Sequence, residues 1–314
     1  MTDVLSERQP RVGFVGAGRT GTALAVGLRN AGYRVVAAAS RSRGSAETLA
    51  ARVPGCLVCA THQEVANAAD MVFVTTPDTA ISSVAALVRW RAGQWVVHCS
   101  GAHSLELLLP AQRQGAEVAS FHPLLTFGSV EQAIKSLPGT TFALEGSGHL
   151  LRALEGMASR LGGTAIRLAP GEKPLYHAAA VLSCGYVAAL LHQAISLWQR
   201  LGLSREAALR GLTHLSMATV EGVQAVGPEA AVTGPIVRGD FATVRKHLEA
   251  LGNKAPDLVP LYCHLGLASL SMTGDEAQAQ EMETLLLEYL RAYEPATPAP
   301  FYNPEAVVDL LAML

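Results

Sequence analysis

Three glycines near the amino terminus, Gly16, Gly18 and Gly21, have the spacing G-x-G-x-x-G. In this spacing the first glycine permits a tight turn, the second lets the backbone approach a pyrophosphate, and the third permits close packing of helix on strand. The turn follows the apolar run VGFV, so the free N–H groups of the next helix would meet the phosphates. The predicted lining residues are Gly16, Ala17, Gly18, Arg19, Thr20 and Gly21. The alternative is a glycine-rich turn without a ligand.

The stretch Ser40-Arg41-Ser42-Arg43 follows the next apolar run, where sites for NAD usually carry an acidic residue. A carboxylate there would repel a 2′-phosphate, whereas hydroxyl and guanidinium groups bind one. We therefore expect NADP(H) as the cofactor, with Arg41 as the phosphate clamp and Ser40 and Ser42 as hydroxyl donors. Arg43 is either a second clamp or a solvated side chain.

Two further polar segments follow apolar runs, Thr75-Thr76-Pro77-Asp78 and His98-Cys99-Ser100-Gly101. Ligands of open α/β sheets bind outside the carboxyl ends of the strands, so these segments are expected to border the ribose and the nicotinamide. We assign Thr75, Thr76, Pro77 and Asp78 to the cofactor, and Ser100 and Gly101 to the substrate. Ordinary turn chemistry is the alternative; it is as well supported as function for Asp78, whereas function is favoured for Ser100.

A second group of candidates lies around the segments KPLYHAAAV and SFHPLLTF. Helical spacing places Tyr176 and His177 on one face, with Lys173 close to it. His177 has an ordinary pKa suited to a general acid, although a buried structural histidine is equally compatible. Lys173 stands at a helix start, which the helix dipole makes unfavourable for a cation, and this favours a function. His122 follows a strand and would orient substrate or relay a proton, or act as a structural turn residue.

The segment GPIVRGDFATVRKHLEAL holds a third polar concentration. Asp240 is predicted as a helix N-cap, and Thr243 and His247 lie four residues apart on one helix face. Arg238 can clamp a carboxylate with two hydrogen bonds, or form an ion pair with Asp240 that orders the loop. We predict substrate contacts for Arg238, Thr243 and His247.

Apolar runs and helical patterns alternate through the first half of the chain. The expected strands are Val12–Val15, Arg34–Ala38, Cys56–Val58, Met71–Thr75, Trp95–His98, Glu117–Ser120, Thr141–Leu144 and Ala165–Leu168. The expected helices between the early strands are Thr20–Asn30, Ser45–Ala51, Thr79–Trp90 and Ser104–Gln114. This alternation predicts an α/β Rossmann domain over residues 1–168, with a doubly wound, mostly parallel sheet.

The pattern becomes helical after the turn Ala169-Pro170-Gly171. Helices are expected over 174–201, 204–225, 240–251, 256–272, 275–292 and 304–313, and glycine or proline stops separate them. Residues 169–314 are therefore predicted to form an all-α C-terminal domain for substrate binding and dimerisation. The stretch PATPAPFYNP near the end is expected to be a turn-rich connection.

Composition excludes several classes of protein. The chain has 314 residues, of which 16% are charged, and its net charge is −2, which does not suit a binder of nucleic acid or anionic membranes. The sparse charge indicates that a second subunit covers some apolar surface. Leu175–Trp198 carries no Asp, Glu, Lys or Arg, but its polar side chains, among them His177 and His192, favour a helix buried by its neighbours over a membrane span.

Leader and cysteine patterns point to a cytoplasmic protein. The polar start MTDVLSERQP has no apolar leader, and five cysteines are too few for a disulfide scaffold. Cys56 and Cys59 form a C-x-x-C, but in a strand they would point to opposite faces, so a redox or metal role is not expected. No metal site is predicted, because the histidines have no partner at a recognised ligand spacing.

The motifs GAGRTGTAL, TTPDTAI, HCSGAHSLELL, SFHPLLTF, KPLYHAAAV and GPIVRGDFATVRKHLEAL run along most of the chain. Together they resemble NADP-linked proteins with a Rossmann domain followed by a helical domain like that of 6-phosphogluconate dehydrogenase. That group includes ketopantoate reductases, pyrroline-carboxylate reductases, β-hydroxyacid dehydrogenases and deazaflavin-dependent NADP oxidoreductases. More narrowly, the chain is similar to a Rossmann-like family whose C-terminal domain is of unknown function.

The resemblance implies a catalytic lysine at the start of the first C-terminal helix, which maps onto Lys173. Such a cation would bind a substrate carboxylate or protonate a developing alkoxide. Related reductases carry an amide further along this helix, where this chain has Ser183-Cys184-Gly185. That departure means that the relatives' mechanism does not transfer directly.

These expectations converge on an NADPH-dependent reductase of a small carbonyl- or imine-bearing acid, with a ketopantoate-like substrate as a candidate. Lys173, His177 and Arg238 would surround the substrate, and the expected partner besides the substrate is a second copy of the chain. Two alternatives stay open. One is hydride exchange between NADP and a deazaflavin, and the other is a non-catalytic NADP(H)-binding sensor.

Overall fold

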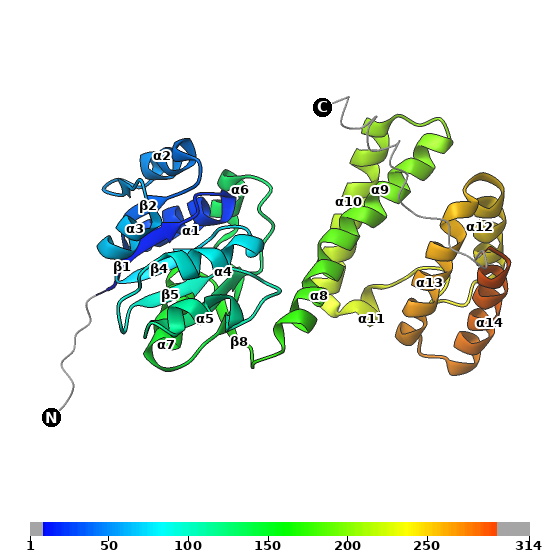
Figure 1. Ribbon diagram of the computed structural model, residues 1–314. Helices are drawn as coiled ribbons and strands as arrows, with labels where there is room; N and C mark the ends of the chain where they lie inside the picture. Colours follow the sequence, from blue (N-terminus) through cyan, green and yellow to red (C-terminus); the bar gives the residue numbers. More distant parts are fainter. Residues whose placement is uncertain (1–8, 294–314) are drawn as a thin grey trace. The chain divides into compact units, whose positions relative to one another are not determined.

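A computed structural model describes residues 9–293 of the chain (Figure 1). The chain divides after Val187 into two compact units, called here the first and the second unit. Helix α8 (Lys173–Ser183) therefore belongs to the first unit, whereas the sequence-based division at residue 168 assigns it to the second.

An eight-stranded sheet organises the first unit, and its strand order is β3-β2-β1-β4-β5-β6-β7-β8. The strands are β1 (Arg11–Val15), β2 (Arg34–Ala39), β3 (Leu57–Val58), β4 (Met71–Val74), β5 (Trp95–His98), β6 (Glu117–Pro123), β7 (Thr141–Glu145) and β8 (Thr164–Arg167). All neighbouring pairs are parallel except β6 and β7. The predicted mostly parallel Rossmann sheet is confirmed, and the strand order reverses between β1 and β4, where such sheets bind ligands.

Two hydrophobic cores cover the two faces of this sheet, because alternate strand residues point to opposite sides. On β4, Phe73 enters one core and its neighbours Val72 and Val74 enter the other. The first core contains a row of fully buried rings, with successive centroids 5.4, 5.8 and 4.7 Å apart: Phe14, Phe73, Phe121 and Phe142. Burial of each ring contributes about 1.5–3 kcal/mol.

Helices pack on both faces of the sheet (Figure 1). The first core takes side chains from α1 (Arg19–Asn30), α2 (Arg43–Arg52) and α7 (Gly148–Arg160). The second takes them from α3 (His62–Ala68), α4 (Asp78–Leu87), the 3₁₀ turn η1 (Leu105–Leu108) and α5 (Leu109–Gln112). This two-sided cover explains why the central strands are apolar on both faces.

Four helical segments of the first unit differ from the expectation. Helix α7, and the seven-residue helices α3 and α6 (Val130–Ser136), were not predicted; α3 and α6 are shorter than the stretch of about 11 residues over which an apolar period can be recognised. The expected helix Ser104–Gln114 is a 3₁₀ turn followed by one short α-turn. Pro110 lies in this segment and has no N–H to donate to a continuous helical ladder.

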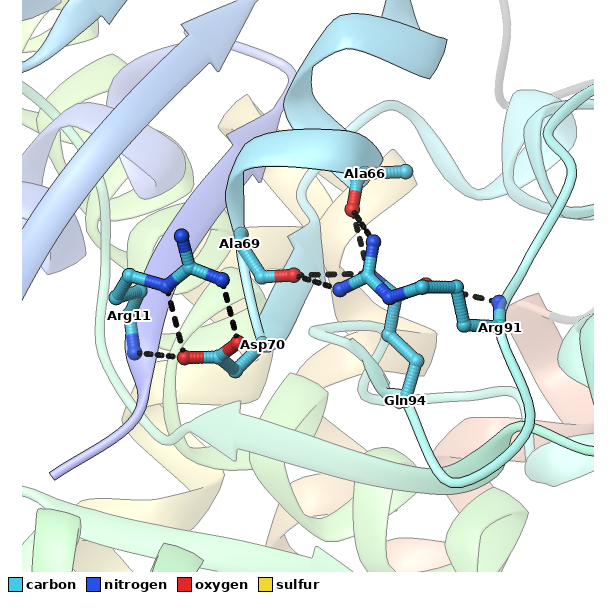
Figure 2. Close-up of polar contacts among 6 residues, drawn as sticks. All are labelled: Arg11, Ala66, Ala69, Asp70, Arg91 and Gln94. Atoms are coloured by element: carbon cyan, nitrogen blue, oxygen red, sulfur yellow. Dashed lines mark hydrogen bonds and ion pairs between the residues drawn. The ribbon is translucent and has the colours of Figure 1, made fainter. Parts of the chain in front are cut away.

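A polar network joins the start of β1 to the end of α3 (Figure 2). Arg11 binds both carboxylate oxygens of Asp70, with Nε 3.0 Å from Oδ2 and Nη2 2.8 Å from Oδ1, and this hydrogen bonding lowers the pKa of Asp70. Arg91 donates to the carbonyls of Ala66 and Ala69 at 2.7 and 2.6 Å. Helix-terminal carbonyls have no intrahelical partner, so Arg91 takes the place of water. The network has a structural role.

The second unit is helical, and no strand occurs within its described residues, 188–293, as predicted. Its helices are most of α9 (Gly185–Arg200), then α10 (Arg205–Val226), α11 (Pro228–Ala231), α12 (Phe241–Lys254), α13 (Val259–Ser269) and α14 (Glu276–Tyr293), with 3₁₀ turns η2 (Pro256–Leu258) and η3 (Leu270–Met272). Its core forms where α12, α13 and α14 meet. The expected helix 304–313 and the PATPAPFYNP turn lie outside the described residues.

The apolar stretch beginning at Lys173 departs from the expectation in two ways. The predicted helix 174–201 is interrupted at Cys184, whose φ of −124° and ψ of −75° are not helical, so α8 and α9 are separate. The prediction that neighbours bury this stretch is wrong for a single copy, because 6% of its most apolar part is buried. By length and composition alone, Lys173–Arg200 could cross a membrane, a test that core helices of soluble proteins also pass.

Candidate functional site

The three motif glycines take the roles predicted for them. Gly16 has φ +106°, and a Cβ there would lie 2.7 Å from the backbone of Thr75 and Thr76. A Cβ on Gly21 would lie 2.4 Å from the Gly16 carbonyl oxygen, so only glycine permits this close packing. Around Gly18 no atom of the described chain, its chain neighbours aside, lies within 4 Å of a Cβ position. The first and third glycines are therefore required by the fold, and the second faces free space.

A cavity of about 320 Å³ opens beside Gly18. Its lining comes from the glycine-rich turn, the loop after β4 and the loop after β5: Gly18, Arg19, Thr20, Thr75, Thr76, Pro77, Asp78 and Cys99. All except Cys99 are among the predicted cofactor residues. No side chain of residues 9–293 caps the N-terminus of α1, which begins in this lining, so its amides suit an anion.

An unpaired hydroxyl in the same cavity indicates a ligand contact. Thr76 Oγ1 is buried and has no hydrogen-bond partner within the described part of the chain. The neighbouring Thr75 Oγ1, in contrast, donates to the Gly16 carbonyl oxygen at 2.7 Å and ties the two loops together. Buried hydroxyls are nearly always hydrogen-bonded, so a bound ligand is the expected hydrogen-bond partner of Thr76 Oγ1.

The predicted phosphate clamp lies at the end of β2. The Gly16 amide donates to the Ala39 carbonyl at 2.8 Å, which holds the end of β2 beside the glycine-rich turn. Arg41 is exposed and makes no ion pair or hydrogen bond with residues 9–293. Arg43 instead pairs with Glu47 at 2.9 Å along α2. Of the two arginines, Arg41 is therefore the one whose guanidinium is available to bind a phosphate.

The loops after β4 and β5 are joined by one side-chain hydrogen bond. Ser100 Oγ donates to Asp78 Oδ2 at 2.7 Å and accepts from the His103 amide at 3.1 Å. His98 orders the same loop: its Nδ1 accepts from the Ser100 amide at 3.1 Å, so Nε2 is the nitrogen that donates to the Ser104 carbonyl. Burial lowers the pKa of His98 to about 3, and the ring is neutral.

Lys173 is fully buried, and its ammonium forms hydrogen bonds inside the first unit. Lys173 Nζ donates to the Ser100 carbonyl oxygen at 2.5 Å and to Ser120 Oγ at 2.6 Å. These bonds tie the start of α8 to the loop after β5 and to β6. Burial lowers the pKa of Lys173 to about 8. A side chain closed off in this way holds other groups in place and does not itself reach solvent.

Three predicted residues form an aromatic cluster around Gly101. His122 Nδ1 lies 2.8 Å from the Tyr176 hydroxyl, and the His122 and His177 rings are 6.1 Å apart between centroids. A Cβ on Gly101 would lie 2.6 Å from His177 Cδ2 and 2.7 Å from His122 Nε2. Gly101 is therefore required because two imidazoles pack against its backbone.

His122 and Tyr176 each keep a single protonation state near neutral pH. Burial, with the nearby charge of Lys173, lowers the pKa of His122 to about 4, so its ring is neutral. Burial raises the pKa of Tyr176 to about 12, so its hydroxyl keeps its proton. A neutral imidazole bonded to a protonated phenol is an arrangement suited to general acid catalysis.

The remaining predicted residues belong to the second unit. Asp240 caps α12 as expected, accepting from the Thr243 amide at 3.1 Å, and Thr243 Oγ1 donates to its other oxygen at 2.8 Å. Arg238 donates to a backbone carbonyl of the preceding loop and forms no ion pair with Asp240. His247 Nδ1 lies 2.9 Å from the Tyr262 hydroxyl. Substrate contacts by Arg238, Thr243 and His247 stay a prediction.

Two observations on the described residues concern metal binding and thiol chemistry. Among residues 9–293 no group of three or more histidine, cysteine or acidic side chains could hold a metal ion. Cys56 and Cys59 are free thiols, and burial raises the pKa of Cys56 to about 11. Thiols protonated at neutral pH are poor nucleophiles.

Ser120 and Glu145 were not among the residues predicted from the sequence, whereas His98 and Cys99 were placed in the correct loop without individual roles. The sequence feature that could have indicated the first two is a polar side chain inside an apolar strand: Ser120 lies in EVASFHP, and Glu145 ends TFALE. A strand buried on both faces rarely carries a carboxylate without a partner, so Glu145 in particular indicates a buried counter-ion.

The fold and the cavity define a Rossmann-type protein with a helical C-terminal region. More particularly, residues 2–123 match the family described as "Rossmann-like domain", and residues 140–269 match "Domain of unknown function (DUF2520)". The chain is therefore a Rossmann-like domain followed by a DUF2520 domain. A comparison with curated proteins gives no match.

Several solved structures share this fold. A Bacteroides fragilis protein described provisionally as an NADP oxidoreductase is 22% identical, with a TM-score of 0.63 over 90% of this chain and 98% of its own. A Thermotoga maritima protein is 24% identical, with the same TM-score and coverage. A reductive aminase from Aspergillus terreus, solved with NADPH and ethyl-5-oxohexanoate, is 16% identical, with a TM-score of 0.58 over 97% and 100% of the two chains. At these identities the likeness shows a common fold.

Proposed function

We propose that this chain is an NADP(H)-dependent oxidoreductase that reduces a small carbonyl or imine compound carrying an acid group. The observation that carries the proposal is the cavity at the reversal of strand order, lined by the N-terminus of α1 and by the unpaired Thr76 hydroxyl. Its fold relatives include the protein described as an NADP oxidoreductase and the reductive aminase solved with NADPH.

The residues present fit a dinucleotide. Gly18 leaves room for the pyrophosphate, the amides at the start of α1 bind it, and Arg41 takes the 2′-phosphate. When bound, the nicotinamide supplies the hydride, and the protein orients the reactants and excludes water. Asp78 and Ser100, joined by their hydrogen bond, fix the two loops that border the cavity.

The proton comes from the Tyr176–His122 pair. Tyr176 is partly exposed and protonated, and its hydroxyl gives its proton to the oxygen or nitrogen that becomes negative as hydride arrives. His122, neutral and 2.8 Å away, orients the phenol, and a proton from solvent restores the phenol after each turnover. This assignment gives Tyr176 the donor role that the sequence suggested for His177 or Lys173.

Cofactor choice is tested by replacing Arg41 with aspartate. Loss of the guanidinium and repulsion of the 2′-phosphate are expected to weaken NADPH binding by about 10–100-fold, with little effect on NADH. Arg43→Asp is the matched control, because Arg43 is occupied by Glu47. Fluorescence titration gives the dissociation constants. Equal affinity of the unaltered protein for NADPH and NADH would contradict the proposal.

Turnover is tested by following NADPH oxidation with panels of 2-keto acids, including a ketopantoate-like one, and of cyclic imines. Tyr176→Phe is expected to abolish most of the activity found while leaving NADPH affinity unchanged. Activity only with a deazaflavin would identify hydride exchange instead. Tight NADPH binding without any turnover would favour an NADP(H)-responsive sensor, the candidate that the full burial of Lys173 supports.

We also infer that the functional form is a dimer that covers the apolar surface of α10. Leu215, Met217 and Val220 are each at least 60% exposed in one copy, which leaves their hydrophobic stabilisation unrealised. Leu215→Glu with Val220→Glu is expected to convert a dimer into a monomer in sedimentation equilibrium. Leu87→Glu, at an exposed leucine of α4, serves as control. A monomeric unaltered protein, or one soluble only in detergent, would contradict the inference.

A further inference from the structure

A buried carboxylate in β7 has no part in the proposed reaction. Glu145 is 4% exposed, and its Oε2 has no hydrogen-bond partner among the described residues. Burying a carboxylate in an apolar sheet is costly unless a positive charge or hydrogen-bond donors compensate it. A carboxylate at this position therefore calls for partners, and the groups that act on it are the Ser104 hydroxyl and the charge of Lys173.

Strand register places Glu145 beside Lys173 through one serine. In the antiparallel pair of β6 and β7, Glu145 stands directly opposite Ser120, so the two side chains share one face of the sheet. Ser120 Oγ accepts from Lys173 Nζ at 2.6 Å, which leaves the serine hydrogen to donate elsewhere. The carboxylate thus lies on the same face of the sheet as the serine that accepts from the ammonium.

The charges agree with this placement. Burial lowers the pKa of Lys173 to about 8, and Glu145 is the strongest influence opposing that shift. Burial raises the pKa of Glu145, and the Ser104 hydroxyl and the charge of Lys173 oppose it. The other titratable groups that face the lysine are Asp78, Cys99, Glu106, His98 and His122. Of the carboxylates, Glu145 is buried on the strand next to the one that holds the ammonium.

We propose that Glu145 is a positioning residue, the buried counter-ion that keeps Lys173 protonated and bound to Ser100 and Ser120. Held in this way, the ammonium keeps the Ser100 carbonyl in place, and with it the Gly101 backbone against His122. Together with burial, the charge of Lys173 keeps His122 neutral. The catalytic consequence rests on the proposed function; the pairing of the two charges does not.

Lysine NMR tests the pairing without any turnover. The chain has four lysines, Lys135, Lys173, Lys246 and Lys254, so [¹³Cε]lysine labelling gives a spectrum that can be resolved. The Lys173 signal is assigned by its loss in Lys173→Met. In the unaltered protein Lys173 is expected to titrate near pH 8, and in Glu145→Gln about one unit lower or more. Glu145→Asp, which keeps the charge, is expected to restore most of the difference.

Glu155→Gln is the matched control, since it removes a carboxylate of the same unit that pairs with Arg167 near the surface. It is expected to leave the Lys173 titration unchanged. The unaltered protein provides a second readout: the Lys173 signal should show an acidic inflection from Glu145 that the other three lysines lack.

Two results overturn the proposal. One is a Lys173 titration in folded Glu145→Gln that matches the unaltered protein. The other, decisive where that variant does not fold, is the absence of the acidic inflection. If an activity is found, Glu145→Gln is expected to shift the alkaline limb of kcat by the NMR difference without changing the KM for NADPH. Failure of that activity assay alone bears on the proposed function and leaves the charge pairing standing.

Discussion

Replacing Lys173 with methionine is expected to lower the free energy of unfolding at pH 7 by about 3–5 kcal/mol. The change leaves Glu145 as a buried carboxylate without its counter-ion and removes the donor that binds both the Ser100 carbonyl and Ser120. Methionine fills a similar volume, so the loss comes from unpaired polar groups and hardly from packing. Urea unfolding followed by circular dichroism measures it.

The double variant Lys173→Met with Glu145→Gln separates this cause from a general loss of packing. Because the second change removes the uncompensated charge, the double variant is expected to be more stable than Lys173→Met alone, a clear departure from additivity. Lys135→Met, at an exposed lysine of α6, is the control and is expected to stay within about 0.5 kcal/mol of the unaltered protein. Additive losses in the double variant would show that the two side chains do not interact.

Alanine at Gly18 and at Gly21 is expected to weaken NADPH binding by two different routes. At Gly18 the added methyl occupies free space, so folding is unaffected, but it stands where the pyrophosphate would lie, and affinity is expected to fall about tenfold or more. At Gly21 the methyl meets the Gly16 carbonyl and Thr75, so stability is expected to fall by about 1–3 kcal/mol as well.

Thermal unfolding and NADPH titration of the same samples distinguish the two routes. Gly156→Ala in α7, where a Cβ meets no atom within 4 Å in the described chain, is the control; a slight gain in stability and unchanged affinity are expected. Unchanged NADPH affinity in Gly18→Ala would mean that the dinucleotide does not bind across this turn.

Local sequence patterns predict those elements whose determining residues lie close together in the chain. The strands of the first unit and the glycine-rich turn lie where expected, because apolar runs and G-x-G-x-x-G are determined by residues close together in the chain. The short helices α3 and α6 were not predicted because seven residues make fewer than two helical turns, too few to distinguish a helical apolar pattern from chance. The break between α8 and α9 at Cys184 was not predicted, because the alanine-rich sequence on both sides favours one continuous helix.

For the site, the residues that border the cavity were predictable and the buried charges behind it were not. Gly18, Thr76 and Asp78 lie in segments whose position at strand ends follows from the alternating pattern. Glu145 and Ser120 are neighbours because β6 and β7 pair antiparallel. The repeating strand–helix pattern predicts parallel pairs, so it does not predict this neighbourhood. From the sequence, Lys173 was therefore predicted to contact the substrate, whereas in the structure its side chain is fully buried.

The sequence by itself determined the class of fold, the glycine-rich turn and the exchange of an acid for Arg41, because each depends on a few adjacent residues. The tertiary structure alone decided which polar groups meet. Lys173, Ser120 and Glu145 come from one helix and two strands, and their pairing depends on strand order and register. Buried charges act over a few ångströms, so their role follows from the packing around them.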